Sequence, residues 1–108
     1  MSLYSTYYLS ESSSTIRPCH DAFLKFIPNN GCTTNYNAVL CYNGMTMVGS
    51  ATLTPGAVPV VNIQFNTSNA TVTLSGDYTS GTVQILQPAW QDPKTVTNLF
   101  LNAFLTYA

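Results

Sequence analysis

Two stretches with alternating apolar residues, 36–42 and 45–53, are separated by nothing more than Asn43 and Gly44. A two-residue hairpin turn of type I′ needs positive φ at both central positions, and Asn followed by Gly adopts this conformation readily. The pattern therefore predicts a β-hairpin. Because a tight turn also fixes which residues face each other, this hairpin constrains the fold more than any other feature of the chain.

The turn sets the register of the two hairpin strands. Tyr42 is expected opposite Met45, and Leu40 opposite Met47, because pairing begins on either side of the turn. Gly49 interrupts the row of side chains and is expected to mark a bulge or a close approach of another backbone. The side chains that we expect on the buried face are Leu40, Met45, Met47, Ala51 and Leu53.

Alternation of apolar and polar residues predicts further strands. These strands are expected within the Tyr-rich stretch 3–9 and within 58–65, 70–74 and 82–87. The segment 20–27 fits both a helix and a strand. We favour a strand, because Pro18 and Pro28 limit the segment to about eight residues, a length that suits strands better than helices.

The C-terminal stretch also supports two interpretations. Asp92 can accept hydrogen bonds from the free amides of a first helical turn, and Pro93 suits the first helical position. Apolar residues then recur at helical spacing between Val96 and Tyr107, as on one face of an amphipathic helix. We therefore expect a helix over 93–106, although alternate residues of the same stretch are apolar too, as in a strand.

These patterns together predict a mainly β protein. We expect a single domain over residues 1–108, folded as a small antiparallel β-sandwich or barrel of about 6–8 strands, with turns at the spacing typical of such folds. The helix over 93–106 would pack on this sheet or on a neighbouring copy.

Charged residues make up 6% of the chain, three Lys or Arg and four Asp or Glu, where about a quarter is usual. Nucleic-acid binding needs clustered cations, and Arg17, Lys25 and Lys94 form no cluster. The most apolar stretch, 99–105, is too short to span a membrane as a helix, and the first residues do not resemble a secretory signal. We expect neither a nucleic-acid partner nor a membrane partner.

The chain offers no convincing set of catalytic residues. His20 is the single histidine and stands between Cys19 and Asp21, yet consecutive residues cannot align a nucleophile, a base and a carboxylate. Asp77 and Asp92 occupy contexts in which Asp is chosen for local hydrogen bonds to the backbone. No zinc, calcium or phosphate-binding spacing occurs. We expect a protein that is not an enzyme and that uses no metal and no cofactor.

The three cysteines leave at least one thiol unpaired. We favour buried free thiols at Cys19, Cys32 and Cys41, because a free Cys behaves as a small apolar residue. A bridge between Cys32 and Cys41, or between Cys19 and Cys32, is the alternative.

Aromatic side chains are the remaining candidates for contact with a partner. Tyr and Trp anchor protein interfaces, because a rigid ring buries a large area while its polar tip keeps a hydrogen bond. The same rings could stack on sugars. Trp90 is the first candidate under either interpretation. The interface or ligand-binding residues that we predict are Trp90, Tyr4, Tyr7, Tyr8, Phe100, Phe104 and Tyr107.

Few charges and a surface of hydroxyls and amides predict a protein that associates readily. We expect a homo-oligomer whose partners are copies of itself and other structural proteins, through side-chain contacts or through an exposed sheet edge. A virion component fits this description best, either a capsid decoration or cement protein or a tail or fibre protein. The alternative is an extracellular or cell-surface module that binds carbohydrate or mediates adhesion.

Overall fold

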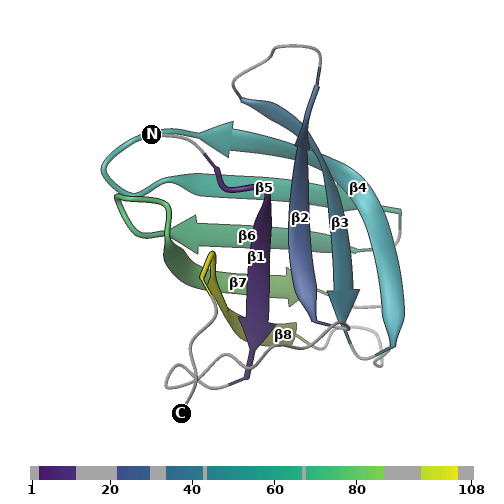
Figure 1. The fold of residues 1–108 in the computed structure, drawn as a ribbon. Coiled ribbons are helices and arrows are strands. Elements are labelled where there is room, and N and C mark those ends of the chain that lie inside the picture. The colour runs from purple at the N-terminus through teal and green to yellow at the C-terminus, as the bar shows by residue number, and fades with distance from the viewer. Residues whose placement is uncertain are drawn as a thin grey trace.

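The computed structural model describes residues 3–11, 22–29, 34–42, 44–66, 68–86 and 96–104. Each strand pairs antiparallel with the next along the chain, and β1 pairs with β8, so that the sheet closes into a barrel (Figure 1). The strands are β1 (Thr6–Ser10), β2 (Phe23–Pro28), β3 (Asn35–Tyr42), β4 (Met45–Thr54), β5 (Val60–Phe65), β6 (Asn69–Leu74), β7 (Ser80–Leu86) and β8 (Val96–Asn102). The expected mainly β fold is confirmed, as a closed barrel of eight strands.

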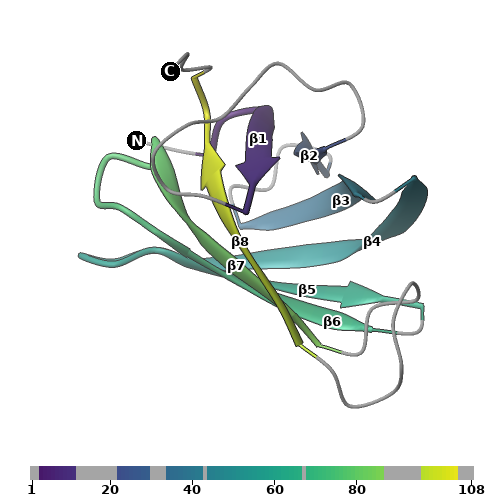
Figure 2. The same cartoon turned by 90° about the horizontal axis from the view of Figure 1, so that it is seen from below.

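The barrel is flattened, with dimensions of 35 × 34 × 22 Å. In one layer β1, β2 and β3 lie side by side, and they cross the direction of β5, β6 and β7 in the other layer (Figures 1 and 2). Strand β4 is the longest and bends from the first layer into the second. Strands that bend in this way form the corners of sheets packed at a large angle.

The hairpin of β3 and β4 has the predicted register. Tyr42 pairs with Met45 and Leu40 with Met47, and Gly44 has the positive φ, 77°, that the turn requires. Four of the five side chains expected on the buried face are buried there. The expectation is wrong for Met45, which is 37% exposed, because β5 covers β4 only from Gly49 onward.

Gly49 marks a close backbone approach. The pairing of β4 runs without interruption through this residue on the side of β3 and begins there on the side of β5, so Gly49 is not a bulge. A Cβ atom at this position would lie 2.1 Å from the carbonyl oxygen of Gln64. The absence of a side chain therefore lets β4 bend and still pair with β5.

The C-terminal helix expected over 93–106 is wrong for the residues that the structure describes. Residues 96–102 form β8, which pairs along its whole length with β7 and, over its last three residues, with β1. Leu99 and Leu101 point into the core, whereas Asn98 and Phe100 are exposed. Pairing with β7 and β1 gives hydrogen bonds to the backbone N–H and C=O groups that a helix would have bonded within itself. Asp92 and Pro93, the helix-start residues, lie outside the described residues.

The strand interpretation of 20–27 is confirmed for its described part, which forms most of β2. In β5, Val61, Ile63 and Phe65 are buried and the residues between them are exposed. The same alternation in the other strands fills the barrel with apolar side chains, as expected for eight strands. Among the described residues, the apolar core side chains with no more than 1% exposure include Tyr7, Leu24, Ala38, Leu40, Val61, Ile63, Val72, Val83, Ile85 and Leu99.

The variant Gly49→Ala is expected to lower the free energy of unfolding by about 1–3 kcal/mol, the usual cost of overpacking, because the added methyl group meets backbone rather than a flexible side chain. Gly56→Ala is the matched control, since nothing lies within 4 Å of its added Cβ. Urea unfolding measures both variants. Equal losses in the two would contradict the close approach at Gly49.

Candidate interaction surface

The outer face of β3 to β8 carries a continuous row of uncharged side chains that are able to form hydrogen bonds. Each member pairs directly with the next across neighbouring strands, so the row crosses six strands. Five of its side chains are exposed, and Thr71 is half-buried. We call this set the amide row: Asn35, Thr52, Asn62, Thr71, Gln84 and Asn98.

A second row runs beside the amide row. It contains Asn37, Ser50, Gln64 and Asn69, and it ends in Ile27 on β2 and Leu86 on β7, both exposed. On the other side, Phe100 pairs with Thr82 in a third row. The amide row is thus bordered by hydroxyls, further amides and a few exposed apolar side chains.

The surface around the amide row carries no charge among the described residues. Between Lys25 and Asp77 the sequence contains no charged residue. Lys25 lies on β2 with its ammonium 5.1 Å from the centre of the Phe23 ring, Glu11 follows β1, and Asp77 lies in the turn before β7. Amides and hydroxyls both donate and accept hydrogen bonds, so this surface can bind a neutral partner without removing water from a charge.

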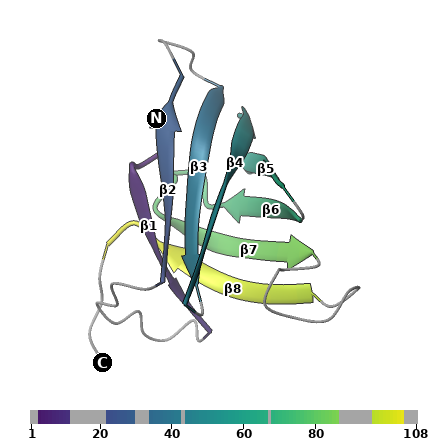
Figure 3. The ribbon, with the colours of Figure 1, turned by 90° about the vertical axis from the view of Figure 1, so that its right-hand side faces the viewer.

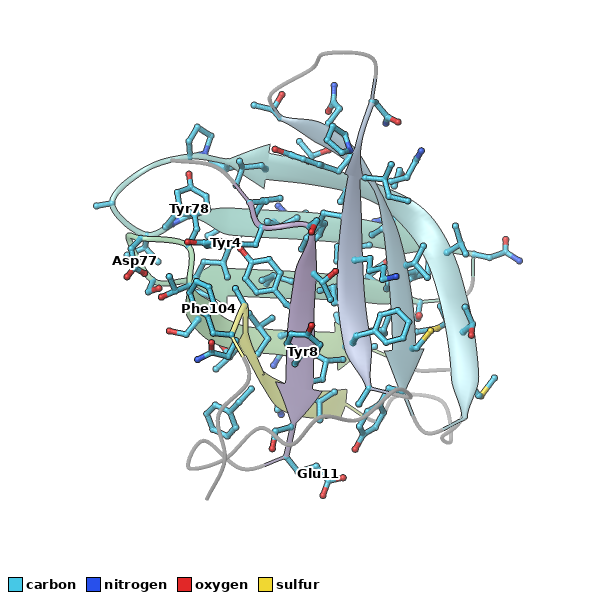
Figure 4. The ribbon with its side chains drawn as sticks, in the orientation of Figure 1. Tyr4, Tyr8, Glu11, Asp77, Tyr78 and Phe104 are labelled. Carbon is cyan, nitrogen blue, oxygen red and sulfur yellow. The ribbon has the colours of Figure 1, made fainter. Side chains whose placement is uncertain are left out.

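The predicted aromatic residues divide into a buried and an exposed group. Tyr7 is completely buried, so its predicted role as a contact residue is wrong: it faces the interior because it alternates with Thr6 and Tyr8. Tyr4 and Phe104 remain exposed, at 38% and 54%. Their rings pack edge to face, with ring centres 5.3 Å apart (Figure 4).

Tyr8 and Phe100 lie on the outer face of the barrel. Tyr8 is half-buried and pairs with Phe23 and Asn102. Phe100 is partly exposed on β8 and pairs with Ser10, two positions along from Tyr8. These two residues lie within β1 and β8, whereas Tyr4 precedes β1 and Phe104 follows β8. Trp90 and Tyr107 lie outside the described residues.

Tyr7 joins the first strand to the turn before the seventh. Its hydroxyl donates a hydrogen bond of 2.7 Å to the carbonyl oxygen of Tyr78 and accepts one from the amide of Tyr4. Desolvation by burial raises the pKa of Tyr7 to about 12. Its ring also contacts Phe26, which contacts Tyr36. These three rings belong to the buried core, and the Tyr7 hydroxyl both donates and accepts a hydrogen bond there.

Asp77 stabilises the turn between β6 and β7, as the sequence predicts. Its carboxylate accepts hydrogen bonds from the Ser75 hydroxyl and from the hydroxyl and amide of Thr79. These bonds, that of Ser75 first, lower the pKa of Asp77 to about 2. Tyr78 follows with φ of 66°, unusual for a residue other than Gly, and its side chain is buried in the core.

Two further polar contacts lie near the opposite end of the barrel. Tyr42 donates a hydrogen bond to Glu11, and desolvation, then this hydrogen bond and the Glu11 charge, raise the pKa of Tyr42 to about 12. Cys41 is a free thiol on the outer face, half-buried, with its sulfur 3.4 Å from the Thr46 hydroxyl. The expectation of a buried core thiol is therefore wrong for Cys41. Cys19, His20 and Cys32 lie outside the described residues.

Sequence reasoning missed the amide row, because its members come from six strands whose mutual registers are not visible in any local pattern. The part of the chain that the structure describes contains no cluster of three or more potential metal ligands and no helix long and apolar enough to cross a membrane. Comparisons with protein-family models, curated proteins and solved structures find no match for this chain.

Tyr7→Phe is expected to lower the free energy of unfolding by about 1–3 kcal/mol, because it leaves the Tyr4 amide and the Tyr78 carbonyl group without a partner in a buried site. Tyr8→Phe, which removes a hydroxyl from the outer face, is the control. Denaturant unfolding at neutral pH measures both. A Tyr7→Phe variant as stable as the control would contradict the role given to this hydroxyl.

Alkaline pH is expected to destabilise the barrel. A folded pKa above the ordinary value of 10 means that the unfolded chain loses its tyrosine protons first, so stability is complete below pH 10 and falls as pH rises toward 12. For Tyr7 this loss is on the order of 2 kcal/mol. Unfolding experiments between pH 9 and about 12 should give a shallower decline for Tyr7→Phe than for the unmodified protein.

Proposed function

We propose that this chain is a structural protein that is not an enzyme and that works by assembly with copies of itself and with other structural proteins. A component of a viral particle, a capsid decoration or cement protein or a tail or fibre protein, is the setting that we favour. The observation that carries the proposal is the amide row, an exposed surface six strands wide without charge.

The chemistry of this surface supports a protein partner. An uncharged face adds no repulsion between copies, and its amides and hydroxyls can fix the orientation of a neighbour through direct or water-mediated hydrogen bonds. Exposed Ile27, Leu86 and Phe100 at its borders supply apolar area. The closed barrel holds the backbone of these residues at the spacing of paired strands, about 4.8 Å, so little backbone freedom is lost on binding.

Assembly is expected to depend weakly on salt, because the contact surface carries no charge for ions to screen. Light scattering across a salt series up to about 1 M should show the same multimer throughout. Dissolution of the multimer by added salt would show that charged contacts hold it together and would contradict the use of this surface.

New charges in the amide row are expected to block assembly. In Asn62→Lys combined with Gln84→Lys, two cations would have to be buried without partners, which should lower incorporation by about tenfold or more. Gly56→Lys combined with Val58→Lys adds the same charge to the exposed loop between β4 and β5 and serves as the control.

Quantitative mass spectrometry of purified particles or cell fractions measures how many copies are incorporated. Full incorporation of the row variant would contradict the proposal. A glycan array probed with the unmodified protein tests the carbohydrate-binding alternative on the same surface: specific hits that the row variant loses would replace assembly as the function of this face.

A further inference from the structure

The start of β1, the end of β8 and the turn between β6 and β7 lie on the same side of the barrel (Figures 1 and 3). The Tyr7 hydroxyl joins the start of β1 to this turn, because it donates a hydrogen bond to the carbonyl oxygen of Tyr78 and accepts one from the Tyr4 amide. The amide of Ala103, just after β8, donates a hydrogen bond of 2.8 Å to the carbonyl oxygen of Thr79. Segments from both ends of the described chain are therefore held against one turn.

Two exposed aromatic rings lie on this side of the molecule. The rings of Tyr4 and Phe104 pack edge to face at an interplanar angle of 70°, so their planes form a corner rather than a stack. The backbone beneath both rings is fixed, because the Phe104 amide donates a hydrogen bond to the side-chain oxygen of Asn102 and the Tyr4 amide donates to Tyr7. The face of an aromatic ring carries negative potential and attracts cations.

The turn itself supplies an exposed carboxylate. Asp77 directly precedes Tyr78, and its hydrogen bonds from the Ser75 hydroxyl and from the hydroxyl and amide of Thr79 all end on Oδ1. These bonds fix the orientation of the carboxylate. No described residue donates a hydrogen bond to Oδ2 of Asp77, so this oxygen can accept one from a donor outside the chain.

Asp77 has no counter-ion among the described residues. Their one cation is Lys25, and its ammonium group lies 5.1 Å from the centre of the Phe23 ring on β2. Ring faces and a carboxylate of fixed orientation favour a positively charged ligand, because both attract it. A neutral sugar could stack on the same rings but would gain nothing from the charge.

We propose that the site formed by Tyr4, Phe104 and Asp77 binds an arginine side chain of a partner protein. A guanidinium group is planar and weakly hydrated, stacks on aromatic faces and donates hydrogen bonds to carboxylates, whereas an ammonium group is a strongly hydrated point charge. The inference rests on the proposed function, since it names the chemistry of a contact with another structural protein. The site adjoins the start of β7 and shares no residue with the amide row.

An NMR titration of the full chain tests the site. The probe is a glycine–arginine–glycine peptide with both ends blocked, so that the guanidinium group is its only charge. The control peptide contains citrulline, which replaces the guanidinium group by a neutral urea group of similar shape. The arginine peptide should shift the signals of Tyr4, Asp77 and Phe104 with a millimolar dissociation constant, and the citrulline peptide should leave them unchanged.

Variants separate the contributions of the ring and the charge. Phe104→Leu and Asp77→Asn should each raise the dissociation constant of the arginine peptide about two- to fivefold, the usual effect of an exposed cation–π contact or ion pair. Tyr4→Phe keeps the ring and should bind as the unmodified protein does. Phe100→Leu removes an exposed ring from the outer face of β8 and is the matched control. Circular dichroism verifies that each variant is folded.

Equal shifts with the arginine and citrulline peptides, or no shift with either, would overturn the inference. Binding that is unchanged in both Phe104→Leu and Asp77→Asn would overturn it as well. A neutral oligosaccharide that shifts the same signals, while the arginine peptide does not, would assign the site to a sugar instead.

The outcomes also separate this inference from the proposed function. Added salt at about 0.5 M should weaken binding of the arginine peptide, because ions screen an exposed charge, whereas assembly through the amide row should not change. Loss of arginine binding with normal incorporation into particles would overturn the arginine site alone. Full incorporation of Asn62→Lys combined with Gln84→Lys would overturn the role of the amide row and leave arginine binding in place.

Discussion

The pairing of the first strand with the last is the constraint on which this structure depends. It consists of three residue pairs, Tyr8 with Asn102, Leu9 with Leu101 and Ser10 with Phe100. Closure gives every strand an inner and an outer face, so that alternate residues can be entirely apolar inside. It also gives each strand a hydrogen-bonded strand on both sides. The chain can thus satisfy its hydrogen bonds through the sheet and needs few ion pairs on its surface.

The same closure determines which side chains lie on the outer face of the barrel. Since apolar residues occupy the interior, the outward positions collect the Asn, Gln, Ser and Thr residues in which the chain is rich, and the strand registers align them in rows. An uncharged surface of this kind would recognise a partner by its shape and by the direction of its hydrogen bonds, both of which act only at short range. Exposed apolar side chains, Ile27, Leu86 and Phe100, lie at its borders.

Local patterns predicted the parts of the fold that depend on neighbours in sequence. The Asn43–Gly44 turn fixed the hairpin and its register, and alternation located most of the remaining strands. The C-terminal segment was misjudged because its conformation depends on β7 and β1, one of which lies at the other end of the chain. Tyr7 was misplaced for a related reason: its hydroxyl has a partner in Tyr78, 71 residues away. The amide row requires the registers of six strands at once.

The contact between Tyr4 and Phe104 brings segments near the two ends of the described chain together on one side of the molecule. A short linker between these two segments would make the chain circular. The circular chain could then be opened in an exposed loop, such as the one around Gly56, without changing which strands pair. Cargo joined to either of these segments would leave from the same side of the barrel. Attachment points at Tyr4 and Phe104 would therefore lie side by side.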